Sequence, residues 1–122
     1  MKIVVTSQGS DLEATVDPRF GRCANFIVVD TESLQFTVLA NAASGAVGGA
    51  GIQAGQMIAE QGVEAVVTGN VGPNASRVLS GAGIKVYVGA SGTVREAIEA
   101  FKAGRLSAAA GPTVSGHWGM GG

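Results

Sequence analysis

The sequence predicts an α/β domain in which a five-stranded mixed sheet carries helices on both faces. Short apolar runs rich in β-branched residues, such as residues 65–67, are typical of strands buried on both sides of a sheet. Glycine-rich loops separate these runs from stretches whose apolar residues recur at helical spacing. The resulting alternation of strand, loop and helix is typical of parallel strands joined by helical crossovers.

Three strands are expected before the first helix. Residues 3–5 form a short apolar run, and the polar residues 6–13 end it in a loop. An irregular loop with proline and glycine at residues 17–23 leads into a second strand at residues 26–29. Residues 34–38 alternate between apolar and polar side chains and predict a third strand with one wetter face. We expect the last two strands to pair as an antiparallel hairpin, with the third at the sheet edge.

Three helices are expected in the second half of the chain. The first follows the glycine-rich loop at residues 44–51. The second begins near Pro73, because proline lacks the N–H that the first turn of a helix leaves unbonded. The third begins with a capping box, in which Thr93 precedes Glu96 by three residues.

Strands at residues 65–67 and 84–88 complete the predicted sheet and run parallel to the first strand. If the first strand lies beside the fourth, residues 6–9 lie next to residues 69–74, in the crevice where open α/β sheets bind ligands. This arrangement is that of the ribonuclease-H-like fold. Nucleases of that fold hold metal ions with carboxylates from neighbouring strands. Residues 2–6 contain no carboxylate, so a nuclease is not expected.

Composition indicates one domain at residues 1–106, followed by a flexible glycine-rich tail at residues 107–122. The 122 residues are 46% hydrophobic and 14% charged, which is too apolar for a disordered chain. A formal net charge of -1 with eight scattered Lys and Arg gives no basic surface for nucleic acid. No apolar run reaches the roughly 18 residues of a membrane span, so we expect a cytoplasmic protein.

Residues 69–74, with the sequence Gly-Asn-Val-Gly-Pro-Asn, are the strongest candidate for a binding site. Gly69 and Gly72 can adopt backbone angles that other residues avoid, and the loop leaves N–H groups at the carboxyl end of a strand. These N–H groups favour an anionic ligand. Asn70 and Asn74 either add hydrogen bonds to that ligand or serve only as turn and helix-start residues.

Two further groups of residues are candidates for the same ligand. Arg19 and Arg22 either clamp an anion or are surface charges, and their place in a Pro-Gly loop favours the clamp. The loop with Gly49 and Gly51 either binds the ligand or only allows close packing of the chain.

The possible metal ligands are a single cysteine and a single histidine. Cys23 cannot form a disulfide within the chain, so it is either a cluster thiolate, activated by nearby arginines, or a small buried hydrophobe. His117 lies in the tail beside Trp118 and Met120 and is either a soft-metal ligand or a solvated residue. A lone thiol favours a metal site shared between chains, so a homo-oligomer is one expectation.

Three motifs together resemble the dinitrogenase iron-molybdenum cofactor biosynthesis family. They are Asp-Pro-Arg-Phe-Gly-Arg-Cys at residues 17–23, Gly-Ala-Gly-Ile-Gln at residues 49–53 and Gly-Asn-Val-Gly-Pro-Asn-Ala at residues 69–75. The resemblance covers residues 1–106. It implies a ribonuclease-H-like fold and, as in nitrogenase relatives, a small carrier that holds an iron-sulfur or iron-molybdenum precursor between assembly steps. Some carriers of the family have a histidine where this chain has Arg19.

We therefore expect a non-enzymatic protein that binds or carries an iron-sulfur or iron-molybdenum type cluster during cofactor assembly or storage, with cofactor-assembly proteins as partners. No Ser-His-Asp or Cys-His pairing can be identified, so catalysis is not expected. Two alternatives stay open. The same loops could bind a small phosphorylated or carboxylated molecule, or the third strand could pair with another protein as an exposed edge.

Overall fold

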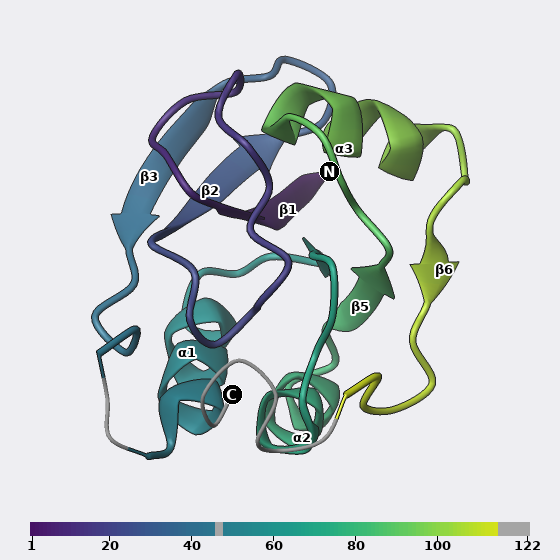
Figure 1. Cartoon of the computed structure of the whole chain (residues 1–122). Coiled ribbons are helices and arrows are strands. Elements are labelled where there is room, and N and C mark those ends of the chain that lie inside the picture. Colours follow the sequence, from purple (N-terminus) through teal and green to yellow (C-terminus); the bar gives the residue numbers. More distant parts are fainter. Residues whose placement is uncertain (46–47, 115–122) are drawn as a thin grey trace.

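The structure is a computed structural model that describes residues 1–45 and 48–114 of the chain (Figure 1). Strands and helices alternate after an initial group of three strands, as the sequence predicts. In chain order the elements are β1 (Lys2–Ser7), β2 (Asn25–Asp30), β3 (Phe36–Ala40), α1 (Ala50–Ala59), β4 (Ala65–Val67), α2 (Pro73–Gly81), β5 (Lys85–Val88), α3 (Val94–Lys102) and β6 (Ser107–Ala108).

The described strands form one mixed sheet in the order β3-β2-β1-β4-β5-β6. β2 pairs antiparallel with both β1 and β3, whereas β4 pairs parallel with β1 and β5. The predicted hairpin, the edge position of the third strand and the parallel set of the first, fourth and fifth strands are therefore confirmed. Val4 lies opposite Val28 on one side and Val66 on the other, so the apolar runs meet at the centre of the sheet.

The sheet has a sixth strand, so the prediction of five strands is wrong. Ser107 and Ala108, which the sequence analysis placed in the tail, form β6 and pair antiparallel with Val88 and Tyr87 of β5. Both residues of β6 are small and exposed, so the strand leaves no apolar pattern in the sequence. Residues 109–114 of the predicted tail follow β6 and are described, whereas residues 115–122 lie outside the described residues.

The third strand begins later than the alternation of residues 34–38 predicts. Leu34 has a left-handed backbone with φ of 61° and belongs to the turn before β3. The Asp30 side chain shapes that turn, because its Oδ1 accepts hydrogen bonds from the N–H groups of Glu32 at 2.9 Å and Ser33 at 3.0 Å. β3 is exposed on both faces except at Leu39, so it lacks the single buried face that alternation predicts.

Helices cover both faces of the sheet, as the sequence predicts (Figure 1). α1 and α2 pack on one face, where Ile58 and Leu79 are fully buried against Val66. α3 packs on the other face through Val94 and Ile98. Within the described residues, no helix is long and apolar enough to cross a membrane.

Candidate functional site

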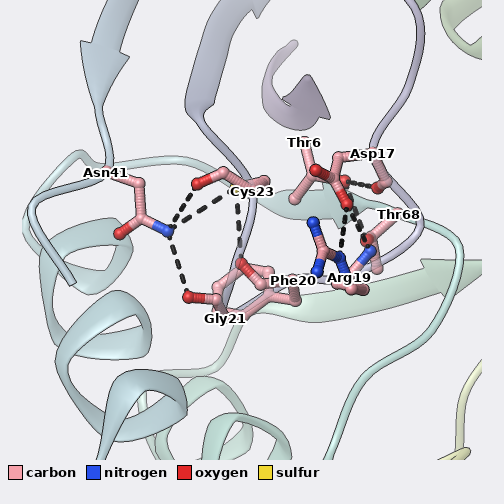
Figure 2. A network of polar contacts seen from close by, with 8 residues as sticks. All are labelled: Thr6, Asp17, Arg19, Phe20, Gly21, Cys23, Asn41 and Thr68. Atoms are coloured by element: carbon pink, nitrogen blue, oxygen red, sulfur yellow. Dashed lines mark hydrogen bonds and ion pairs between the residues drawn. The ribbon is translucent and has the colours of Figure 1, made fainter. Parts of the chain in front are cut away.

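The loop at residues 17–23 is fastened at its first end to the sheet by buried polar groups (Figure 2). The Thr6 hydroxyl donates to the backbone carbonyl of Asp17 at 2.7 Å and lies 2.8 Å from the Thr68 hydroxyl. The N–H of Asp17 donates back to the Thr6 carbonyl at 3.0 Å. Because Thr6 and Thr68 sit on neighbouring strand ends, this network fixes where the loop leaves the sheet.

The second end of the same loop is fastened by Asn41 (Figure 2). The amide nitrogen of this buried side chain donates to the carbonyls of Gly21 at 3.1 Å and Cys23 at 2.9 Å. Its amide oxygen accepts from the N–H of Ala43 at 3.0 Å. The loop is therefore held at both ends by hydrogen bonds, and its central residues keep a defined position.

Both predicted arginines come from this loop, and each has a partner. The Arg19 backbone N–H donates to Asp17 Oδ1 at 2.9 Å, and its Nε lies 3.3 Å from the same oxygen. Arg19 is 43% exposed in its side chain, whereas Asp17 is 4% exposed, so the guanidinium also reaches solvent. Arg22 donates from Nη1 to the carbonyl of Ser44 at 2.9 Å, which ties the loop to the segment before α1.

Gly69 allows the loop at residues 17–23 to lie against the segment after β4. A Cβ at this glycine would lie 2.6 Å from the Cα of Pro18, which is too close for any side chain. The N–H of Asn70 donates to the Pro18 carbonyl at 2.8 Å, and Arg19 and Asn70 form a parallel bridge. The two predicted loops are thus in direct backbone contact.

Gly72 does not have the unusual backbone angles that the sequence analysis allowed for it. Its φ of -84° and ψ of 173° are extended and open to other residues.

Gly72 is the N-cap of α2, and Gly49, with φ of 70°, is the N-cap of α1. Among the described residues, neither helix has a side-chain cap, and neither has an acidic residue in its first turn. The first N–H groups of both helices are therefore not capped by described side chains.

Four of the predicted site residues line one small pocket. Its described lining consists of Arg19, Phe20, Gly21, Arg22, Asn70, Gly72, Ala75 and Val114. Gly49, Gly51 and Asn74 are not among these residues, although Asn74 follows in the first turn of α2. The pocket holds about 10 Å³, which is room for about one water molecule. A larger group would sit across its mouth or require its walls to move.

Cys23 is fully buried in the core beneath this loop. Its thiol donates to the carbonyl of Phe20 at 3.4 Å. Burial, followed by the nearby charge of Asp17, raises the pKa of the Cys23 thiol from 9.0 to about 12. The arginines therefore do not activate this thiol, and the environment is that of a small buried hydrophobe.

His117, the other predicted metal ligand, lies outside the described residues. Among the residues that the structure describes, no group of three or more His, Cys, Asp or Glu side chains could hold a metal ion. The described part of the candidate site therefore offers N–H groups and guanidinium groups, which suit an anion.

A larger groove of about 610 Å³ lies between α2, β5 and the segment at residues 108–112. Arg77 and Lys85 line it, together with serine hydroxyls and apolar side chains. None of the predicted site residues is in its lining, so this groove and the candidate site are separate features.

The sequence analysis missed the residues that position the loop at residues 17–23. Thr6 and Thr68 directly follow buried apolar strand residues, and such a position is a usable signal, because a polar side chain is buried there only if its hydrogen bonds are made. Asn41 follows the exposed strand β3, so this signal does not mark it. The signal does not identify the hydrogen-bond partner, because Thr6 and its partner Thr68 are 62 positions apart in the sequence.

Solved structures of high similarity share this fold over nearly the whole chain. The apo form of the orange protein from Desulfovibrio gigas is 43% identical, with 93% of this chain and 96% of that chain covered and a TM-score of 0.89. A Thermotoga structure of the DUF35 family is 42% identical, with 88% and 91% covered and a TM-score of 0.76. An uncharacterized protein of Methanocaldococcus jannaschii is 33% identical over 94 residues, which are 75% of this chain and 80% of that protein.

The family comparison covers the whole region that carries the three motifs. The model of the dinitrogenase iron-molybdenum cofactor family matches residues 1–104, which include the loop at residues 17–23, the N-termini of α1 and α2, and α3. The three motifs at residues 17–23, 49–53 and 69–75 all lie within that range. This chain belongs to the dinitrogenase iron-molybdenum cofactor family.

Proposed function

We propose that this protein binds an anionic metal-sulfur cluster, of the iron-sulfur or iron-molybdenum type, and holds it during cofactor assembly or storage. The observation that carries the proposal is the meeting of Arg19 and Arg22 with the uncapped N-terminus of α2 around one pocket. N–H groups at a helix N-terminus and guanidinium groups both stabilise negative charge. Family membership supports a cluster as the anion.

The bound cluster would sit over the mouth of the pocket, because the pocket itself is too small to enclose it. Arg22 and Asn70 both line the pocket, so both would lie beside the cluster. Arg19 would contribute less of its charge, because Asp17 already neutralises part of it. The backbone N–H groups after Gly49 and Gly51 in α1 extend the positive region, since α1 packs beside α2.

Direct ligation is proposed for His117 rather than for Cys23. His117 follows Thr113 by four positions in the sequence, and its imidazole is a donor that soft metals accept. Thr113 itself is hydrogen-bonded to Val71 beside the pocket. Cys23 would have to leave the core and lose its proton against a pKa of about 12 before it could bind metal.

No catalytic role is part of the proposal. The cluster would be passed to or received from cofactor-assembly proteins, and β3 offers these partners an exposed edge. Phe36 and Val38 on that strand are 38% and 41% exposed. The same edge would serve a homo-oligomer or a protein-interaction role, because unpaired strand edges accept further strands.

The proposal is tested by reconstitution with ferrous iron and sulfide under exclusion of oxygen, followed by gel filtration. We expect iron and sulfide to elute with the protein and to give a visible absorption band. His117→Ala should lower the retained iron, whereas Cys23→Ala should retain as much as the wild type. Protein that elutes without iron and sulfide would contradict the proposal.

The alternative ligand, a small phosphorylated or carboxylated molecule, uses the same N–H and guanidinium groups. It is favoured by the absence of a group of metal-binding side chains among the described residues. Inorganic phosphate and citrate are suitable probes for this alternative. A rise in melting temperature with either anion, combined with no retained iron, would replace the cluster by a small anion as the ligand.

A further inference from the structure

The segment at residues 107–114 is attached to the domain at two places. β6 pairs with β5, and the N–H of Ala109 donates to the carbonyl of Val86 at 2.8 Å. Further along, the N–H of Val71 donates to Thr113 Oγ1 at 2.9 Å, and the N–H of Thr113 donates to the Val71 carbonyl at 2.8 Å. The segment therefore runs from the sheet edge to the loop between β4 and α2.

The bonds from Thr113 hold the middle of the candidate binding loop. Val71 lies between Asn70 and Gly72, both of which line the pocket, and the residue is 1% exposed and belongs to the core. Val71 is therefore fixed from one side by packing and from the other by Thr113. The residue after Thr113, Val114, lines the same pocket.

The threonine hydroxyl is the part of the side chain that this contact needs. Oγ1 accepts from the Val71 N–H and also lies 3.3 Å from the Val71 carbonyl, to which it can donate. Valine has the same shape as threonine but no hydroxyl, so it would leave the Val71 N–H without its described acceptor. Serine keeps the hydroxyl and would keep the contact.

We propose that Thr113 is a positioning residue of the cluster site, which fixes the backbone of residues 70–72 so that their polar groups face the bound anion. This inference rests on the proposed function, since it assigns a role to the C-terminal segment at that same site. Thr113 acts through Val71 and does not itself touch the cluster. Preorganised groups bind more tightly, because less freedom is lost on binding.

If Thr113 only stabilised the fold, its loss would lower the melting temperature and the cluster retention together. Thr113 is exposed, and so are both residues of β6, so the segment adds little buried apolar surface to the core. Loss of its hydroxyl should therefore affect the loop at residues 70–72 more than the overall melting temperature.

The test uses full-length Thr113→Val, Thr113→Ser and wild-type protein, with the iron and sulfide reconstitution as the binding assay. Thr113→Val should lower cluster retention about fivefold, as expected for one lost hydrogen bond. Thr113→Ser should retain as much cluster as the wild type. Amide hydrogen exchange of Val71 in the unloaded protein should be faster in Thr113→Val and normal in Thr113→Ser. Thr37→Val on exposed β3 serves as the matched control and should change neither readout.

Each remaining outcome overturns a defined claim. If the wild type retains iron and sulfide and Thr113→Val retains as much, the positioning role alone is overturned. Unchanged exchange of the Val71 amide in Thr113→Val also overturns it, because the bond would then not hold the loop. No retention by the wild type overturns the proposed function and, with it, the role of Thr113 at a cluster site.

Discussion

The three helices differ in how their N-termini are capped: α3 has side-chain caps, whereas α1 and α2 have none among the described residues. At α3, Thr93 Oγ1 accepts from the N–H of Glu96 at 3.1 Å, and the Glu96 carboxylate accepts from the N–H of Thr93 at 2.9 Å. At α1 and α2 the N-cap is a glycine, and no described side chain caps the first turn. Side chains of the domain therefore satisfy N–H groups at the start of α3. At α1 and α2 the first N–H groups are left to backbone, solvent or a ligand.

The two kinds of helix end also differ in charge. Glu96 places a negative charge at the positive end of α3, where it is stabilised by the helix dipole. Around the N-terminus of α2 the charged residues that line the pocket are Arg19 and Arg22, so positive charges add to the positive end of the helix. The comparison indicates that the α3 end serves stability, whereas the α2 end is suited to an anion.

The largest effect is expected for Gly69→Val, which would separate the two loops that form the α2 site. The new Cβ would meet Pro18 within 2.8 Å at two atoms, so the backbone must shift, at a cost of about 1–3 kcal/mol or more in unfolding free energy. Thermal unfolding and cluster retention should both decrease. Gly81→Ala, where a Cβ meets no described atom within 4 Å, is the control and should not lower stability. An unchanged melting temperature for Gly69→Val would disprove the contact.

The next effect concerns Cys23 and alkaline pH. Its pKa is raised to about 12 in the fold by burial and by Asp17, so the unfolded chain loses this proton first, near the ordinary value of 9.0. This thiol therefore leaves the free energy of unfolding unchanged below pH 9 and lowers it between pH 9 and about pH 12, by about 1.4 kcal/mol per pH unit. Urea unfolding at pH 8 and pH 10 should show this decrease in the wild type and a smaller decrease in Cys23→Ala. Equal decreases would mean that the thiol is not protected by burial.

A smaller effect is expected for Thr93→Ala at the α3 end. Loss of an N-cap costs about 1 kcal/mol of stability, which lowers the melting temperature by a few degrees. Retention of iron and sulfide should stay at the wild-type level, because the capping box is on the opposite face of the sheet from α1 and α2. Reduced retention in this variant, measured well below its melting temperature, would show that the two regions are not independent.

Much of the fold could be predicted because local signals agree with the final packing. The apolar runs of β1 and β4 are buried on both faces, and the capping box of Thr93 and Glu96 marks the start of α3. Where the signals were weak the predictions failed. Leu34 continues an apparent alternation but lies in a turn, and Ser107 and Ala108 pair through backbone groups that any sequence has.

The candidate site could be predicted only in its parts. Arg19, Arg22 and Asn70 were identified from loop composition, and the structure brings them to one pocket. The contacts that assemble the site join residues far apart in the chain. Thr113 and Val71 are separated by 42 positions, and no local pattern marks such a pair.

The most direct test of the central claim compares two pairs of arginines. Arg19→Gln with Arg22→Gln removes two charges at the α2 site, and Arg77→Gln with Arg95→Gln removes two charges that do not line the pocket. The measurement is the amount of iron and sulfide retained after reconstitution, with the melting temperature of each variant as a check on folding. The account predicts at least about a tenfold loss of cluster affinity for the first pair and less than about a twofold loss for the second. Equal retention by both double variants would contradict it.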